Sequence, residues 1–195
     1  HEHLNNQIAS QSLFNRETPV LVNGANMLFS SSLIDQYRDS LNTDLVSGDD
    51  VLFAQSLGPG ERSMCLSRQG AVFTQAAETS KSLWNQRIRW LSKQGNQGKV
   101  AKAFSATLFS FSLLHLYAVG VMMTSGMWIW LAIYLGLRFI IELSFHSVWF
   151  HRLGEKVNYL DAFILTVIYP MYAVVMGLVS LFKPSFEWKG RVQRA

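Results

Sequence analysis

The chain has 195 residues, of which 49% are apolar, and it carries 17 Lys and Arg against 13 Asp and Glu. The apolar residues gather after Ala101, whereas residues 1–98 mix polar and charged side chains with short apolar runs. This uneven distribution argues against a single soluble domain and predicts a membrane boundary near residue 100. The single cysteine, Cys65, excludes an internal disulfide and favours a cytosolic setting for the first half.

Basic residues flank the apolar runs and account for part of the positive charge. Such flanks favour the cytoplasmic leaflet of a membrane over nucleic acid as the partner. At the start, HEHLNNQIAS has neither the basic segment nor the apolar run of a signal peptide, and we expect the protein to continue upstream. His1 and His3 have no cysteine or carboxylate cluster nearby, so we expect no metal site there. The flanking basic residues are Lys99, Lys102, Arg152, Lys156, Lys183, Lys189, Arg191 and Arg194.

Three helices and a short strand are predicted in the first half. One helix follows a Gly-containing turn and starts within residues 25–30, and a second starts within residues 47–49. A strand is possible at residues 71–74. The third helix is capped by Thr79 or Ser80 and runs toward Gly95. It suits a membrane interface, with an apolar stripe of Leu83, Trp84, Ile88 and Leu91 and with Arg87 and Lys93 on more polar sides.

Three apolar runs follow, at residues 103–124, 127–145 and 159–182. Each is long enough to cross a bilayer core of about 30 Å as a helix. The first two are joined by a short uncharged turn and therefore predict a tight hairpin. Trp128 and Trp130 lie where an interfacial aromatic belt is expected.

Two charged residues interrupt the second run. Arg138 and Glu142 are four residues apart, so on a helix they share a face and partly neutralise each other away from lipid. We predict a structural ion pair; the alternative is a direct role in guiding a charged lipid or glycan. His115 in the first run is expected to make a polar contact between helices.

The third run raises a question of topology. Pro170 at its centre predicts a kink. If residues 1–98 are cytosolic, three crossings would place the basic tail at residues 184–195 outside, against the positive-inside rule. Either the third run is re-entrant or interfacial, or the rule is overridden here.

Three short stretches are candidates for chemistry: NGAN at residues 23–26, SGDD at residues 47–50 and QRIRW at residues 86–90. Taken singly, they are explained by a turn, a helix cap and a basic interfacial helix. Gly-Asp-Asp also occurs in RNA-dependent RNA polymerases. Such a polymerase would need a further upstream carboxylate motif and a large basic template channel, whereas this chain soon turns into membrane spans.

Taken in this order before transmembrane helices, the motifs resemble membrane-bound family 2 glycosyltransferases, which include cellulose, chitin and hyaluronan synthases and many bacterial transferases. The resemblance spans residues 18–194 and is most specific in ETSKSLWNQRIRWLSKQ; the FEWKGR tail also matches. It implies an α/β fold of the GT-A type. The acceptor-side part of that fold would occupy residues 1–98, followed by two to three transmembrane helices within 99–183 and a basic tail at 184–195.

The resemblance also implies roles for individual residues. Asp50 would be the general base with Asp49 as its acidic partner, because a carboxylate can take the proton of an attacking hydroxyl. Arginines can hold the leaving diphosphate by paired hydrogen bonds, and an indole can pack on a sugar face. The donor pyrophosphate would meet Gln86, Arg89 and Arg87, and the acceptor would meet Trp90, Asn23, Gly24 and Asn26.

The donor-binding half of the family, with its Asp-x-Asp metal motif, is not found in this sequence. We therefore expect Mg²⁺ or Mn²⁺ to be held by residues outside this chain, and the chain alone to be inactive. The expected reaction is inverting transfer of a hexosyl or N-acetylhexosaminyl group from a nucleotide-diphosphate sugar to a lipid or glycan.

The setting would be a multi-pass protein of the cytoplasmic (inner) membrane, with its catalytic part in the cytosol and membrane lipids as partners. Alternatives are a non-catalytic membrane subunit that binds anionic lipid, a processive polysaccharide synthase, and a small transporter element. Nucleic acid is not an expected partner.

Overall fold

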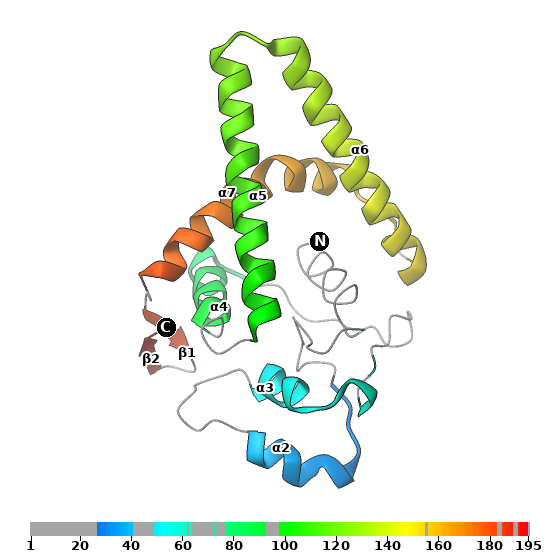
Figure 1. The fold of residues 1–195 in the computed structure, drawn as a ribbon, viewed down its shortest axis with the longest axis vertical. Helices are drawn as coiled ribbons and strands as arrows, with labels where there is room; N and C mark the ends of the chain where they lie inside the picture. Colours follow the sequence, from blue (N-terminus) through cyan, green and yellow to red (C-terminus); the bar gives the residue numbers. More distant parts are fainter. Residues whose placement is uncertain are drawn as a thin grey trace.

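The computed structural model describes residues 27–40, 49–61, 63, 72, 77–92, 98–154, 156–182, 185–188 and 191–194. Within these ranges the chain is mainly helical and contains one two-stranded antiparallel sheet. A long helical hairpin projects away from the shorter elements, which gather around its base (Figure 1). The strand expected at residues 71–74 lies mostly outside the described residues, and the α/β fold of the GT-A type stays a prediction.

Two short helices precede the membrane segments. A single 3₁₀ turn, η2 (Ser31–Leu33), leads into α2 (Ile34–Ser40), and the hydroxyl of Ser30 caps the turn by accepting a hydrogen bond from the amide of Ser32. The second helix, α3 (Asp49–Ser56), begins within the predicted range, and a further 3₁₀ turn, η3 (Pro59–Glu61), follows it. Both predicted helices are present, and the start of the second is confirmed, whereas the first begins at Ser31, just after the predicted range of residues 25–30.

Aromatic packing holds α2 against α3. The ring centroids of Tyr37 and Phe53 are 4.8 Å apart in an edge arrangement, and Phe29 contacts both rings. Phe53 is buried. Such pairs stabilise a contact beyond the area they bury, so this small cluster fixes where α3 begins relative to α2.

The third predicted helix is α4 (Ser80–Ser92), and its start is capped as expected, because the hydroxyl of Thr79 accepts a hydrogen bond from the amide of Ser82 at 3.1 Å. The structure differs from the expectation on Arg87. This side chain is only 8% exposed, rather than lying on a polar side of the helix. The helix packs against two further elements, so the side facing Arg87 is covered by protein.

The three apolar runs form helices α5 (Lys99–Thr124), α6 (Trp128–Leu153) and α7 (Tyr159–Leu181), each long and apolar enough to cross a membrane. The first two form the predicted hairpin, whose turn places Gly126 at a φ of 69°. Gly154 ends α6 at a φ of 70°. Both φ angles lie in the left-handed region, which glycine adopts without steric cost because it has no Cβ. The glycines therefore favour the ends of α5 and α6 at these positions.

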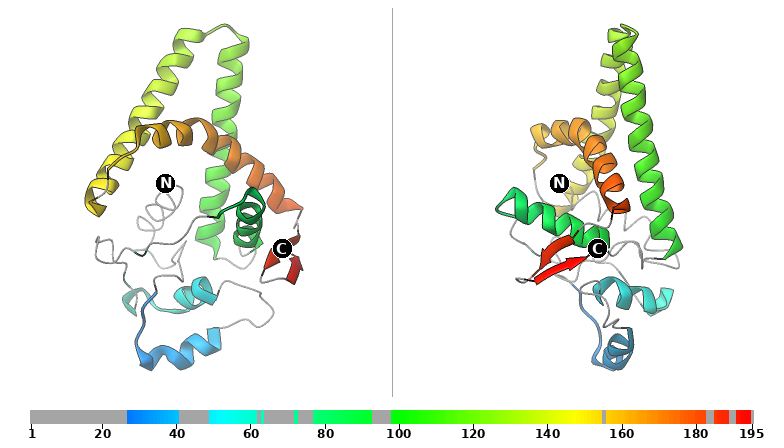
Figure 2. Two further views of the ribbon diagram at one scale, coloured as in Figure 1. Left: turned by 180° about the vertical axis from the view of Figure 1, so that it is seen from behind. Right: turned by 90° about the vertical axis from the view of Figure 1, so that its left-hand side faces the viewer.

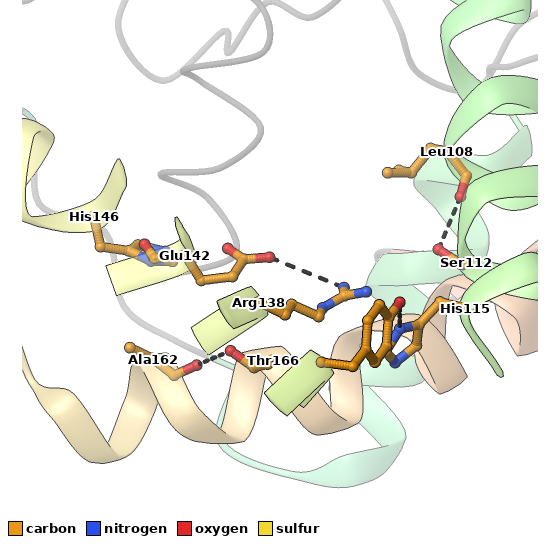
Figure 3. Close-up of polar contacts among 9 residues, drawn as sticks. Leu108, Ser112, His115, Arg138, Glu142, His146, Ala162 and Thr166 are labelled. Carbon is orange, nitrogen blue, oxygen red and sulfur yellow. Dashed lines mark hydrogen bonds and ion pairs between the residues drawn. The ribbon is translucent and has the colours of Figure 1, made fainter. Parts of the chain in front are cut away.

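Polar contacts join the hairpin helices and neutralise its charges (Figure 3). A hydrogen bond of 2.6 Å links Nδ1 of His115 in α5 to the hydroxyl of Tyr134 in α6. Within α6, a guanidinium nitrogen of Arg138 lies 4.0 Å from a carboxylate oxygen of Glu142. The interhelical contact of His115 and the pairing of Arg138 with Glu142 are both confirmed, and the structural role of that pair stays a prediction.

Helix α7 crosses the hairpin instead of running parallel to it, and it packs on both α5 and α6 (Figure 2). It bends along its length, as expected of a helix with Pro170 inside it. The side chain of Asn158 caps its start by accepting a hydrogen bond from the amide of Leu160. The two ends of α7 therefore reach different parts of the molecule.

The segment predicted only as a basic tail contains a small sheet. Strand β1 (Ser185–Trp188) pairs with β2 (Arg191–Arg194), and β1 packs on α4. The amide of Glu187 donates a hydrogen bond of 3.2 Å to the Asn85 side chain, and its carboxylate lies 3.3 Å from the Lys81 ammonium. The end of the described chain is thus attached to the helix that precedes the membrane segments.

The contact between α5 and α7 predicts a steric test. A Cβ at Gly177 would clash with the ring of Phe109, whereas a Cβ at Gly120 would meet nothing within 4 Å. We expect Gly177→Ala to lower the free energy of unfolding by about 1–3 kcal/mol through overpacking. Gly120→Ala should be neutral or slightly stabilising, because alanine favours helix. Thermal unfolding in detergent micelles measures both, and equal midpoints would contradict the packing.

Candidate active site

The acidic motif forms the start of α3. Asp49 is exposed, and one of its carboxylate oxygens accepts a hydrogen bond of 3.0 Å from the hydroxyl of Tyr37. Asp50 is half-buried, and its carboxylate accepts a hydrogen bond of 2.9 Å from the amide of Val51. Carboxylates at a helix start are stabilised by the free amides there, so the position suits two neighbouring negative charges.

The tyrosine partner of Asp49 responds to this negative charge. The hydrogen bond to Asp49 raises the pKa of Tyr37 above its ordinary value of 10.0. Burial and the charges of Asp49 and Asp50 act in the same direction. The tyrosine hydroxyl therefore remains a donor throughout the physiological range and holds the Asp49 carboxylate in place.

The basic motif lies on α4, where Gln86, Arg89 and Trp90 share one helical face because they are three and four residues apart. All three side chains are half-buried. Burial lowers the pKa of Arg89, and the carboxylate of Asp50 opposes that shift. The structure therefore brings the acidic start of α3 and the basic face of α4 within electrostatic reach of each other.

Arg87 lies between two aromatic rings. Its guanidinium carbon is 4.5 Å from the ring centroid of Trp90 and 6.0 Å from that of Tyr172 in α7. A cation over an aromatic face is attracted by about 0.5–2 kcal/mol, more when water is excluded. Arg87 thus connects the basic motif to a membrane helix.

The burial of Ile88 sets the rotation of α4 about its axis. Ile88 is fully buried against Met176 of α7 and Phe186 of β1, with Leu91 packed beside them. At about 100° per residue, a residue two positions away points to nearly the opposite face of the helix. Burying Ile88 therefore turns Gln86 and Trp90 away from the contact with Met176 and Phe186.

Sequence reasoning missed two residues of this site. Tyr37 lies in the polar segment of α2, and its hydrogen bond to Asp49 becomes visible only in the folded structure. Tyr172 is one aromatic residue in a long apolar run, and the run alone gives no signal for its position beside Arg87. Three predicted acceptor residues, Asn23, Gly24 and Asn26, lie outside the described residues.

Metal binding was expected only from residues outside this chain, and that stays a prediction. Among the described residues, His, Cys, Asp and Glu do not gather into a group of three or more that is suited to a metal ion. Asp49 and Asp50 stand at the start of α3 with Tyr37 and backbone partners.

Three helices long and apolar enough to cross a membrane follow the acidic start of α3 and the basic motif of α4, an arrangement that fits a membrane protein. Residues 1–195 match the family model described as glycosyl transferase family 21, and the chain belongs to that family. The predicted class, a glycosyltransferase, is confirmed; the family that matches is family 21, not family 2. Searches of curated proteins and of solved structures gave no match.

The Tyr37 to Asp49 contact predicts a pH dependence. The pKa of Tyr37 is higher in the folded state, so the contact stabilises fully below the ordinary tyrosine pKa of 10.0. The stabilisation is lost as pH rises through the folded-state value. Tyr37→Phe should cost about 0.5–1.5 kcal/mol at neutral pH. Hydrogen exchange in α2, compared between wild type and variant from pH 7 to 11, should show a difference that shrinks as pH rises. A difference that grows would contradict the contact.

Proposed function

We propose that this chain is the acceptor-facing part of an inverting glycosyltransferase that moves a sugar from a nucleotide-diphosphate sugar to a lipid or glycan at the membrane. The proposal is carried by the family match over residues 1–195, together with the positions of Asp50 at the start of α3 and of Arg89 on α4, where the Asp50 carboxylate opposes the lowering of the Arg89 pKa. These residues come from separate motifs, and a base beside a diphosphate-binding cation is the pair that the reaction requires.

Asp50 is the proposed general base. The acceptor oxygen attacks the anomeric carbon, its proton passes to the Asp50 carboxylate, and the bond to the diphosphate oxygen breaks with its electron pair leaving on the diphosphate. Asp50 is half-buried at the start of α3, where its carboxylate accepts a hydrogen bond from the amide of Val51. Asp49 is the acidic partner, and its contact with Tyr37 keeps it oriented.

Arg89 is the proposed partner of the departing diphosphate, with Gln86 beside it on the same face of α4. A guanidinium presents paired donors that match phosphate oxygens, and partial burial strengthens their attraction. Arg87 is buried against Trp90 and Tyr172. We therefore assign it mainly to positioning the indole, with a lesser role at the diphosphate.

Trp90 is the proposed acceptor platform. Its half-buried ring stacks with Arg87, and Tyr172 closes the same cluster from α7. A membrane helix that shares residues with the acceptor platform favours an acceptor held at the bilayer. Asn23, Gly24 and Asn26 are proposed to complete the acceptor pocket.

The complete enzyme is proposed to hold Mg²⁺ or Mn²⁺ and the nucleotide through residues outside this chain. The setting is the cytoplasmic (inner) membrane with the catalytic part in the cytosol, in keeping with the basic flanks of the apolar runs. Two or three spans are few for a translocating pore, so we propose single transfer over processive synthesis.

The base assignment is tested in the full-length protein with a panel of labelled UDP- and GDP-sugars and membrane lipids. Asp50→Asn should lower the rate of transfer by about 10²–10⁴-fold, because the amide has no basic oxygen for the proton. Asp39→Asn, an exposed position in α2, is the matched control and should leave the rate unchanged. Equal rates for both variants would remove Asp50 as the base and favour a lipid-binding subunit.

The diphosphate assignment is tested by a charge-conserving change. Arg89→Lys keeps the charge but loses the paired donors, so we expect a fall of about 10-fold or more in kcat/KM for the nucleotide sugar. Arg38→Lys is the control, because Arg38 forms only an exposed ion pair with Asp35. Equal effects of the two changes would contradict a role for Arg89 at the diphosphate.

A further inference from the structure

The position of the small sheet determines the path of the chain through the membrane. Helix α4 precedes α5 in the chain, and β1 follows α7. The two are nevertheless in contact, through the hydrogen bond from the amide of Glu187 to Asn85 and the ion pair of Glu187 with Lys81. Phe186 of β1 is buried against Ile88 of α4. The end of α7 therefore lies on the same side of the molecule as the start of α5.

The hairpin gives a second constraint. α5 and α6 are antiparallel, apolar and joined by a short turn, so a crossing by one is followed by a return crossing of the other. Helix α6 then ends on the side where α5 began, which is the side of α4. Helix α7 starts there, a few residues after α6, and ends beside α4. A helix that joins two points on one side of a bilayer does not span it.

We propose that α7 is a re-entrant helix, embedded in the leaflet on the α4 side, and that its outward face binds the acyl chains of that leaflet. The inference concerns topology and does not depend on the proposed reaction. It also places β2, with Arg191 and Arg194, on the same side as α4, in keeping with the positive-inside tendency.

The surface of α7 has the composition that this setting requires. One side packs on the hairpin, where Gly177 meets Phe109 and Phe163 meets Phe139, and another packs on α4 through Met176. The remaining surface is apolar, exposed and free of charge beyond Asp161 in the first turn. Its exposed residues include Val167, Ile168, Met171, Val175 and Leu178.

The bend in α7 fits the same path. Pro170 lies at the middle of the helix and is buried, so the change of direction occurs where the helix is covered by protein. A backbone carbonyl freed by proline is costly when it faces lipid. Tyr172, one turn or less beyond the bend, then reaches Arg87 of α4 from within the leaflet.

Cysteine labelling in membranes tests the topology of the full-length protein. In a background with Cys65→Ser and any other cysteines replaced, Ser125→Cys marks the hairpin turn and Ser185→Cys marks β1, both at exposed positions. A membrane-impermeant maleimide is applied to right-side-out and to inverted vesicles. We expect the two positions to be labelled in opposite preparations. Labelling of both in the same preparation, or of Ser125→Cys only after detergent, would overturn the proposal.

The lipid contact is tested with Val167→Cys, at an exposed position on α7. The impermeant maleimide should leave this cysteine unlabelled in both vesicle preparations and label it once detergent is added. Labelling in either preparation without detergent would show that water reaches this face and would overturn its assignment to lipid. Thermal unfolding of each variant in detergent, with a midpoint close to that of the parent, verifies that the labelled protein is folded.

Discussion

The structure depends on one apolar contact, in which Ile88 of α4, Met176 of α7 and Phe186 of β1 pack together. Each residue comes from a different region of the chain, and full burial of such a side chain stabilises by about 1.5–3 kcal/mol. Around this contact, Asn85 and Lys81 engage Glu187. The cluster joins the segment before the membrane helices to the segment after them.

The orientation of the site follows from this contact. Because Ile88 packs on Met176 and Phe186, Gln86 and Trp90 point away from that contact, and Arg89 lies within electrostatic reach of Asp50 in α3. Arg87 lies at the border between the two faces, which explains why it is buried against Trp90 and Tyr172. A glycosyltransferase of family 21 thus has its basic motif positioned by a membrane helix.

Local features of the fold were predictable, and long-range ones were not. Helix starts follow from short-range caps, such as Thr79 for α4, and the hairpin follows from uninterrupted apolar length and Gly126. The i, i+4 spacing of Arg138 and Glu142 sufficed for their ion pair. The β1 contact with α4 was missed because it depends on residues about a hundred positions apart. The contact of Tyr172 with Arg87 was missed for the same reason, because it joins residues far apart in the chain. The burial of Arg87 was missed too, because the pattern of α4 places this residue on a polar side of the helix.

The contact of α4 with β1 is the central claim, since both the orientation of the basic motif and the path of α7 depend on it. It is tested most directly by introducing Asn85→Cys and Glu187→Cys into the cysteine-free protein and adding a short bismaleimide to intact membranes. We predict an intramolecular cross-link between these positions and none between Ser125→Cys and Glu187→Cys. Failure of the first pair to cross-link in membranes would contradict the account.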